Sequence, residues 1–156
     1  MNNTAKLIIS IAIPLIVAAI AGYFTATGTG SWYKTIQTPS WNPPNWVFGP
    51  VWTALYILMG VSLYLVWKKD QPVDEKRLAL IFFALQLFFN FCWSFIFFNQ
   101  HQVGLAFLDI VLLWICLLLT IVLFSQINNV AAWLLVPYIA WVSFAGILNF
   151  TIWKLN

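Results

Sequence analysis

The sequence predicts an all-α integral membrane protein, a bundle of five transmembrane helices that forms one domain over residues 1–156. Of the 156 residues, 63% are hydrophobic and only 7% are charged, whereas a soluble domain averages about 25% charged residues. Five stretches are almost continuously apolar for 20 residues or more, and apolar runs of this length are typical of transmembrane helices. Strands of a membrane β-barrel would instead alternate over about 10 residues, so we expect helices only.

The five predicted spans follow one another with little sequence between them. Each is 20–24 residues long, which at about 1.5 Å per residue matches a hydrocarbon core about 30 Å thick. The first span follows Lys6 and ends in small residues, as a signal peptide does, but its apolar run exceeds the usual length of about 7 to 15 residues and four more spans follow. The spans are predicted over residues 7–26, 46–67, 78–98, 103–124 and 130–153.

The first span and the connection after it differ sharply in character. Ala18, Gly22 and Ala26 place a small residue at every fourth position of the span, a pattern that predicts close approach of a neighbouring helix. The connection over residues 28–45, which we name the lid loop, is longer than a simple link needs. It is stiffened by prolines that include Pro43 and Pro44 and carries Trp32, Tyr33 and Trp41. Long ordered loops of this kind often act as lids.

Polar and aromatic side chains inside the later spans recur at helical spacing. Trp52 and Tyr56 are four residues apart on the second span, and Trp141, Ala145 and Asn149 repeat the same spacing on the fifth. The stripe on the third span contains Gln86, Asn90, Trp93, Ser94 and Phe97. Residues three and four apart share one helix face, so each stripe is expected to point in one direction.

These stripes allow two interpretations. Asp109 is the only acidic residue inside a predicted span, and polar groups in a membrane mark either functional sites or contacts between helices. In the first interpretation, the amides and aromatic rings only join helices. In the second, which we favour, they line a cavity that opens beneath the lid loop, and such a cavity suits a large, flat, mostly apolar ligand.

The charged and sulfur-containing residues restrict orientation and chemistry. Lys6, Lys68, Lys69, Lys76 and Arg77 lie on the side that holds the amino terminus, against Lys34 and Lys154 on the other, so the positive-inside rule predicts a cytoplasmic amino terminus. Cys92 and Cys116 are expected at depths about 10 Å apart, too far for a disulfide. His101 has no second ligand nearby, so we expect no metal site. We expect membrane lipid but no nucleic acid as a partner.

Four long segments resemble the TspO/MBR family, the tryptophan-rich sensory or translocator proteins. They are "WYKTIQTPSWNPPNWVFGPVWTALY", "NFCWSFIFF", "GLAFLDIVLLW" and "PYIAWVSFAGILNFTIWKLN". The resemblance runs from about Trp32 to the end of the chain. It implies a five-helix bundle, commonly a homodimer, with no required cofactor, that binds porphyrins such as protoporphyrin IX or haem beneath the first connection. By motif position, it implies that the ligand contacts Tyr33, Pro43, Trp52, Tyr56, Asn90, Trp93, Ser94, Trp141 and Ala145.

Three functions therefore remain open from the sequence. The first is a tetrapyrrole-binding membrane protein that acts in sensing, transport or breakdown. The second is an enzyme that destroys porphyrin under light; since no nucleophile, triad or metal cluster is present, its chemistry would run through Trp52 and Trp141. The third is a small-solute transporter that uses Asp109.

Overall fold

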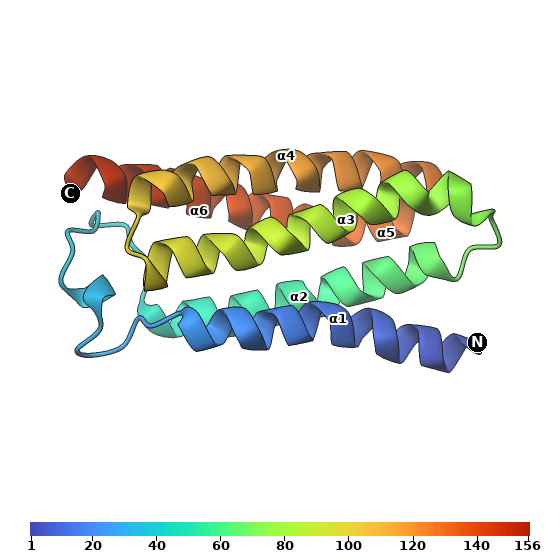
Figure 1. Ribbon diagram of the computed structural model, residues 1–156, viewed down its shortest axis with the longest axis horizontal. Coiled ribbons are helices and arrows are strands. Elements are labelled where there is room, and N and C mark those ends of the chain that lie inside the picture. The colour runs from blue at the N-terminus through green and yellow to red at the C-terminus, as the bar shows by residue number, and fades with distance from the viewer.

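The computed structural model describes residues 1–156, and every regular element in it is helical. Five helical segments are long and apolar enough to cross a membrane, which confirms the predicted fold class (Figure 1). A 3-10 turn, η1 (Trp32–Lys34), lies in the lid loop, and a π-helical segment, η2 (Phe95–Asn99), continues α3. The helices are α1 (Asn3–Phe24), α2 (Asn45–Trp67), α3 (Val73–Ser94), α4 (Val103–Ile127), α5 (Asn129–Leu134) and α6 (Val136–Leu155).

The two ends of the bundle carry different connections. The lid loop, the link between α3 and α4 and the carboxyl terminus lie at one end, and the amino terminus and the link between α2 and α3 lie at the other (Figure 1). This is the distribution that alternation of five spans predicts. Which end faces the cytoplasm stays a prediction from the charged residues.

Several helix ends differ from the predicted spans; α1 begins earlier, at Asn3, and α4 ends later, at Ile127. α1 ends at Phe24 because Thr25 adopts an extended conformation, and α2 begins at Asn45, so the lid loop occupies residues 25–44 in the structure. α3 begins at Val73, directly after Pro72, whereas the apolar pattern begins only at Leu78. Its first turn is acidic, with Asp74 and Glu75, and acidic side chains interact favourably with the positive end of the helix dipole. Hydropathy alone detects only the apolar part of such a helix.

The fifth span crosses the membrane as two helices. α5 ends at Leu134 and α6 begins at Val136, and Pro137 lies in the first turn of α6. Proline has no N–H to donate and its ring clashes with the carbonyl four residues earlier, here that of Trp133. The helical hydrogen bonding of the predicted span over 130–153 is therefore interrupted at Leu135, within a single crossing.

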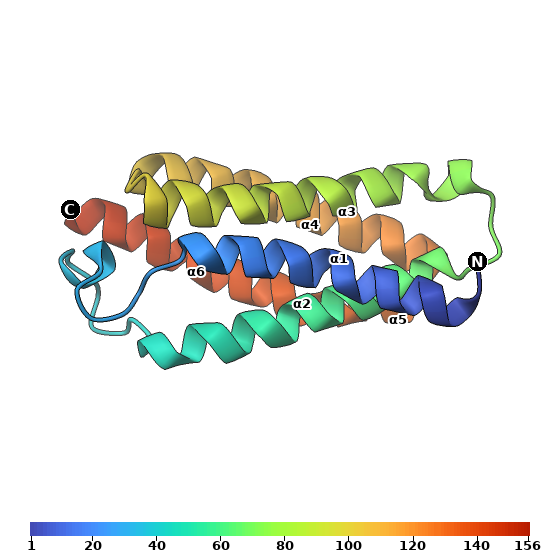
Figure 2. The same ribbon diagram turned by 60° about the horizontal axis from the view of Figure 1, so that its bottom comes forward.

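α1 and α2 cross at Ile11 and Gly60, near the middle of both helices. A Cβ atom added at Gly60 would lie 2.6 Å from the Cα of Ile11 and 3.0 Å from the carbonyl oxygen of Ser10. A Cβ atom added at Gly22 would meet no atom within 4 Å. The close approach predicted at the row containing Gly22 is therefore wrong there, because α1 and α2 diverge toward the lid loop (Figure 2).

Candidate functional site

Hydrogen bonds and stacked rings tie the lid loop to the rest of the bundle. Asn45 Nδ2 of α2 donates to the Thr27 carbonyl at 2.5 Å. Gln37 and Asn156 exchange two hydrogen bonds: the Gln37 N–H donates to Asn156 Oδ1 at 3.0 Å, and Asn156 Nδ2 donates to the Gln37 carbonyl at 2.9 Å. The ring of Trp32 stacks on His101 in the link between α3 and α4, with ring centroids 4.2 Å apart and planes 12° apart. The loop therefore lies as an ordered cover over the end of the bundle.

Tyr33 is the lid residue that reaches furthest into the protein. Its ring is buried and lies against Phe97 and Phe98, with centroids 6.2 and 5.6 Å away. Its hydroxyl donates to Asn42 Oδ1 at 3.0 Å. Burial raises the pKa of Tyr33 above its usual 10.0, and the hydrogen bond to Asn42 opposes that shift. The side chain therefore stays neutral and holds the loop closed across its own turn.

Aromatic rings from three helices meet around Trp52 of α2. The centroid of Trp52 lies 5.8 Å from that of Tyr56, 6.3 Å from Trp93 of α3, and 6.2 and 6.5 Å from Tyr138 and Trp141 of α6. These separations fall within the range in which aromatic pairs interact favourably. The helical spacing in the sequence therefore brings its aromatic faces together, as predicted.

A chain of hydrogen bonds lies deeper than this aromatic cluster. The Tyr56 hydroxyl donates to Asn90 Oδ1, Asn90 Nδ2 donates to the Tyr138 hydroxyl at 2.7 Å, and that hydroxyl donates to Gln86 Oε1 at 2.8 Å. All four side chains are buried. Because both ends of the Asn90 amide are occupied, Asn90 joins α2, α3 and α6 in this structure.

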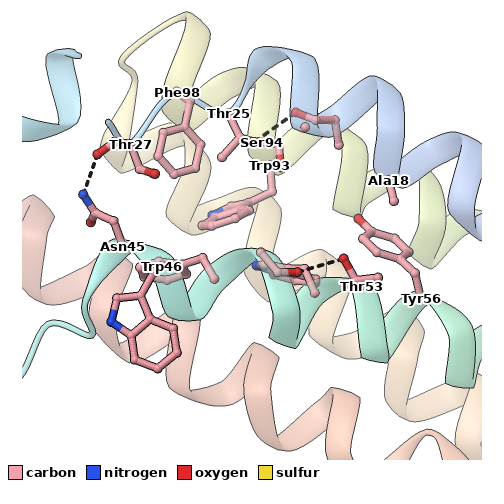
Figure 3. Close-up of a pocket in the computed structure, with 15 residues that line it drawn as sticks. Ala18, Thr25, Thr27, Asn45, Trp46, Thr53, Tyr56, Trp93, Ser94 and Phe98 are labelled. Carbon is pink, nitrogen blue, oxygen red and sulfur yellow. Dashed lines mark hydrogen bonds between the residues drawn. The ribbon is translucent and has the colours of Figure 1, made fainter. Parts of the chain in front are cut away.

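Two cavities adjoin the aromatic cluster at the lid end. The outer cavity has a volume of about 400 Å³ and lies between α1, α2 and α3 (Figure 3). The inner cavity lies under the lid loop and has a volume of only about 20 Å³. The outer cavity is lined by Ala18, Ala21, Gly22, Thr25, Thr27, Asn45, Trp46, Phe48, Gly49, Trp52, Thr53, Tyr56, Trp93, Ser94 and Phe98. The inner cavity is lined by Tyr33, Phe48, Trp52, Trp93, Phe97, Phe98, Trp141, Ala145, Leu148, Asn149 and Ile152.

The structure brings seven of the nine implied ligand-contacting residues to these cavities. The outer cavity is lined by Tyr56 and Ser94, and the inner cavity is lined by Tyr33, Trp141 and Ala145. Both cavities are lined by Trp52 and Trp93. Pro43 and Asn90 line neither, nor do the lid residues Trp32, Trp41 and Pro44. Trp41 instead packs edge-on against Phe144 of α6, with centroids 5.9 Å apart.

Asp109 lies outside both linings, contrary to the expectation that it contributes a carboxylate to the cavity wall. It is on α4, its side chain is 8% exposed, and its Oδ2 atom has no hydrogen-bond partner. α4 contributes no lining residue to either cavity. The position of Asp109 along its span could not show that α4 lies behind α3 and α6 and away from the cavities.

Asn149 lines the inner cavity, but both ends of its amide bond to protein groups. Its Oδ1 atom accepts from Trp93 Nε1 at 2.9 Å, and its Nδ2 atom donates to the Val103 carbonyl at 2.9 Å. Asn149 therefore fixes the orientation of the Trp93 ring.

Trp141 differs from Trp93, because its Nε1 atom is buried and has no hydrogen-bond partner. An unpaired buried donor costs about 1–3 kcal/mol, so this N–H is available to an acceptor on a ligand.

Sequence reasoning missed most of the outer cavity. Its wall on α1 consists of small residues, Ala18, Ala21 and Gly22, together with Thr25. Small residues allow close packing and open space equally well, so the sequence carried no signal that separates the two. Phe48 and Phe98, which line both cavities, lay in the predicted spans but were not singled out as ligand contacts.

The sulfur and imidazole groups do not assemble into a metal centre. Cys92 and Cys116 are both free thiols, as their predicted separation required. No group of three or more His, Cys, Asp or Glu side chains is placed to hold a metal ion. His101 is occupied by its stack on Trp32, in a left-handed backbone conformation with φ of 58°.

Comparison with known proteins identifies the family. Residues 10–154 match the TspO/MBR family. The chain belongs to the TspO/MBR family. The tryptophan-rich protein TspO of Chlorobaculum tepidum is 44% identical over 159 residues, which cover 97% of this chain and 98% of that protein. The human translocator protein is 43% identical over 126 residues, or 80% of this chain and 75% of that protein.

Other relatives agree with this assignment. The tryptophan-rich sensory protein of Cereibacter sphaeroides is 36% identical over 125 residues, which cover 80% of this chain and 77% of that protein. All residues that line the two cavities fall within the part of the chain that matches the TspO/MBR family. With five helices able to span a membrane, this TspO/MBR chain is an integral, multi-pass membrane protein.

Proposed function

We propose that this protein binds a porphyrin or a similar flat tetrapyrrole at the lid end of the bundle and acts in tetrapyrrole sensing, transport or breakdown. The observation that carries the proposal is the meeting of Trp52, Trp93 and Trp141, from three different helices, at two adjoining cavities. Indole faces offer large, rigid apolar area to a flat ring. Relatives named as sensory and translocator proteins support a role of this kind.

The buried N–H of Trp141 adds specificity to this apolar surface. Ligand sites are mostly apolar, with a few placed polar groups that fix orientation. Porphyrins carry carboxylate or ester oxygens at the ring edge, and one of these atoms can accept the hydrogen bond that Trp141 does not make within the protein. Binding then relieves the cost of an unpaired buried donor.

Occupation of the inner cavity requires side chains to move. Sites for drug-sized ligands have volumes of about 300–1,000 Å³, a range that includes the outer cavity of about 400 Å³ but not the inner one of about 20 Å³. Phe48, Trp52, Trp93 and Phe98 line both spaces. Rotation of these rings joins the two cavities into one site that reaches Trp141.

The test is a titration of the purified protein with protoporphyrin IX, followed by quenching of tryptophan fluorescence. We expect Trp141→Phe to weaken binding about tenfold, since it removes one hydrogen-bond donor at a buried site, and Tyr33→Ala to weaken it as well. Trp133→Phe is the matched control, because Trp133 is 72% exposed and lines neither cavity. Unchanged affinity in both Trp141→Phe and Tyr33→Ala would refute the site.

Assembly and orientation extend the proposal. We propose a homodimer, which the resemblance to the family implies, and a cytoplasmic amino terminus, which Lys68, Lys69, Lys76 and Arg77 at that end support. The mass of the detergent-solubilised protein, corrected for bound detergent, tests the first. Accessibility of a reporter fused to the amino terminus in intact cells tests the second.

A second candidate function is light-dependent breakdown of the bound porphyrin. Trp52 and Trp141 both line the inner cavity with centroids 6.5 Å apart, so two readily oxidised indoles adjoin the place proposed for the pigment. Protein with bound protoporphyrin IX should bleach the pigment under illumination, and the variant with both Trp52→Phe and Trp141→Phe should bleach it more slowly, compared at equal occupancy. No observation favours the transporter alternative, because Asp109 lines neither cavity.

A further inference from the structure

The outer cavity is the space between two helices that diverge. α1 and α2 meet at Gly60 and Ile11 and separate toward the lid loop (Figure 2). The wall on α1 is formed by small side chains, and no residue of α4, α5 or α6 lines the cavity. The cavity therefore lies at the side of the bundle, between α1 and α2, and not along its central axis.

α1 is the least buried of the five membrane-spanning segments. Only 17% of its most apolar stretch is buried, against 33–39% for the other four spans. None of its side chains donates to or accepts from a side chain of another helix. The hydroxyl of Thr25, directly after α1, donates back to the Ala21 carbonyl of α1 at 2.9 Å. At the mouth of the outer cavity, Asn45 Nδ2 at the start of α2 donates to the Thr27 carbonyl, just past α1, at 2.5 Å. Away from that bond, no side-chain hydrogen bond joins α1 to α2, and apolar contacts hold the boundary between them.

A free hydroxyl group lies inside this space. Ser94 is only 7% exposed, lines the outer cavity, and makes no hydrogen bond within the protein (Figure 3). Buried polar groups are nearly always paired, so a hydroxyl left free at the back of an apolar cavity suits a polar atom on a passing or bound molecule. Ser94 is a neighbour of Trp93, whose ring separates the outer from the inner cavity.

The alternative route, through the lid loop, is obstructed by specific contacts. It would require loss of the two hydrogen bonds between Gln37 and Asn156 and of the stack between Trp32 and His101. The lateral route requires rotation of the shared rings, of which Trp52 and Trp93 are the largest. The Trp52 side chain makes no hydrogen bond, whereas rotation of Trp93 breaks its hydrogen bond to Asn149. A tetrapyrrole is mostly apolar and partitions into the bilayer, so it reaches the outer cavity without leaving lipid.

We propose that the outer cavity is a lateral portal, through which a tetrapyrrole passes from the bilayer between α1 and α2 to the inner cavity. The inference rests on the proposed function, because it concerns the route to the same site. Ala18 and Gly22 keep the portal open, Trp52 and Trp93 form its inner gate, and Ser94 offers a hydrogen bond part-way along it. The lid loop then retains the ligand and is not its route of access.

The test compares binding rates in lipid nanodiscs, with protoporphyrin IX already dissolved in the bilayer and tryptophan quenching followed by stopped flow. Ala18→Leu places a larger side chain in the portal and should slow association and dissociation about tenfold each, the rate equivalent of moderate overpacking, with the equilibrium affinity changed little. Ala19→Leu is the matched control, since Ala19 is exposed and lines neither cavity. It should bind at wild-type rates.

Two further variants separate a blocked portal from a folding defect and from a looser lid loop. Gly22→Leu enters open space and should reproduce the slow binding even if Ala18→Leu folds poorly. Asn156→Ala loosens the lid loop and should leave association unchanged.

Faster association in Asn156→Ala, or wild-type association rates in folded Ala18→Leu and Gly22→Leu, would overturn the portal while leaving the proposed function intact. A large loss of affinity without slower association would show that the outer cavity is the binding site itself and would also overturn it. Absence of quenching in the wild type would refute the proposed function and the portal together.

Discussion

Asn90 provides a test of whether the buried amides serve the fold or the ligand. Its two ends bond to Tyr56 of α2 and Tyr138 of α6, although motif position implies that it contacts ligand. Asn90→Leu keeps the approximate size of the side chain and removes both hydrogen bonds. Tyr138 still donates to Gln86 after the change, whereas the Tyr56 hydroxyl loses its acceptor.

The size of the effect follows from these contacts. Hydrogen bonds between helices in membranes average about 0.6 kcal/mol each in double-mutant cycles. A hydroxyl left unpaired in a buried site adds about 1 kcal/mol or more. We therefore expect Asn90→Leu to lower the free energy of unfolding by about 2 kcal/mol. Reversible unfolding in mixed micelles with increasing SDS, followed by circular dichroism, measures it.

A double-mutant cycle isolates the contribution of the pair. Tyr56→Phe removes the hydroxyl that Asn90→Leu would leave unpaired, so the second substitution should cost about 1 kcal/mol less in the Tyr56→Phe background than in the wild type. Costs that simply add, to within about 0.3 kcal/mol, would refute the network that we describe.

The same variant separates stability from binding. Because both ends of the Asn90 amide bond to protein groups and Asn90 lines neither cavity, Asn90→Leu should leave the affinity for protoporphyrin IX nearly unchanged in protein that remains folded. Trp141→Phe should show the reverse, with weaker binding and little loss of stability, since Trp141 Nε1 has no partner to lose. Strongly reduced affinity in Asn90→Leu at normal stability would show that Asn90 contacts the ligand after all.

Three other predictions test the helix packing and the lid loop. Gly60→Ala should lower the free energy of unfolding by about 1–3 kcal/mol, because the added Cβ would lie 2.6 Å from Ile11 Cα. Gly22→Ala should be neutral or stabilising, because its added Cβ meets no atom within 4 Å. If both substitutions changed the free energy of unfolding in SDS equally, that would contradict the divergence of α1 and α2. The pKa of Tyr33 is raised above 10.0 by burial, so the contribution of this side chain to stability is present below pH 10.0 and is lost as the pH rises through the raised pKa. Wild type should therefore lose stability above pH 10.0 more steeply than Tyr33→Phe. Parallel profiles of stability against pH for the two proteins would exclude this linkage. Amide hydrogen exchange should be faster in the lid-end half of α1 than at the same depth in α3, and bound protoporphyrin IX should slow it; equal protection of the two helices would argue against an independently opening α1.

The number of spans is predictable from the sequence, whereas their ends are not. A bilayer requires about 20 apolar residues for each crossing, so hydropathy fixes five spans with little freedom. Nothing requires a helix to end where the apolar pattern ends, and α3 begins five residues earlier, directly after Pro72. The interruption at Leu135 follows from Pro137, whose consequence depends on how the preceding turn accommodates the ring.

The site was predictable to the level of helix faces. A period of 3.6 residues places Trp52 on the same face as Tyr56, and places Trp93 and Ser94, three and four residues after Asn90, on the face that Asn90 shares. Trp52, Tyr56, Trp93 and Ser94 line the outer cavity. Whether an inward amide bonds to another side chain or remains free depends on the distance to the next helix, which no sequence pattern encodes. That is why Asn90, with both ends of its amide paired, and Trp141, whose N–H is free, looked alike from the sequence.

The unequal ties among the helices explain how one bundle can be both rigid and open to a large ligand. Side-chain hydrogen bonds join α2, α3 and α6 through Asn90, and α3 to α6 through Trp93 and Asn149. α1 has no such bond and is held to α2 mainly where Gly60 meets Ile11. Lipid competes with protein for apolar contacts in a membrane, so small outward movements of the lid-end half of α1 cost little. The aromatic cluster keeps its geometry during such a movement, because none of its anchors lies on the helix that moves.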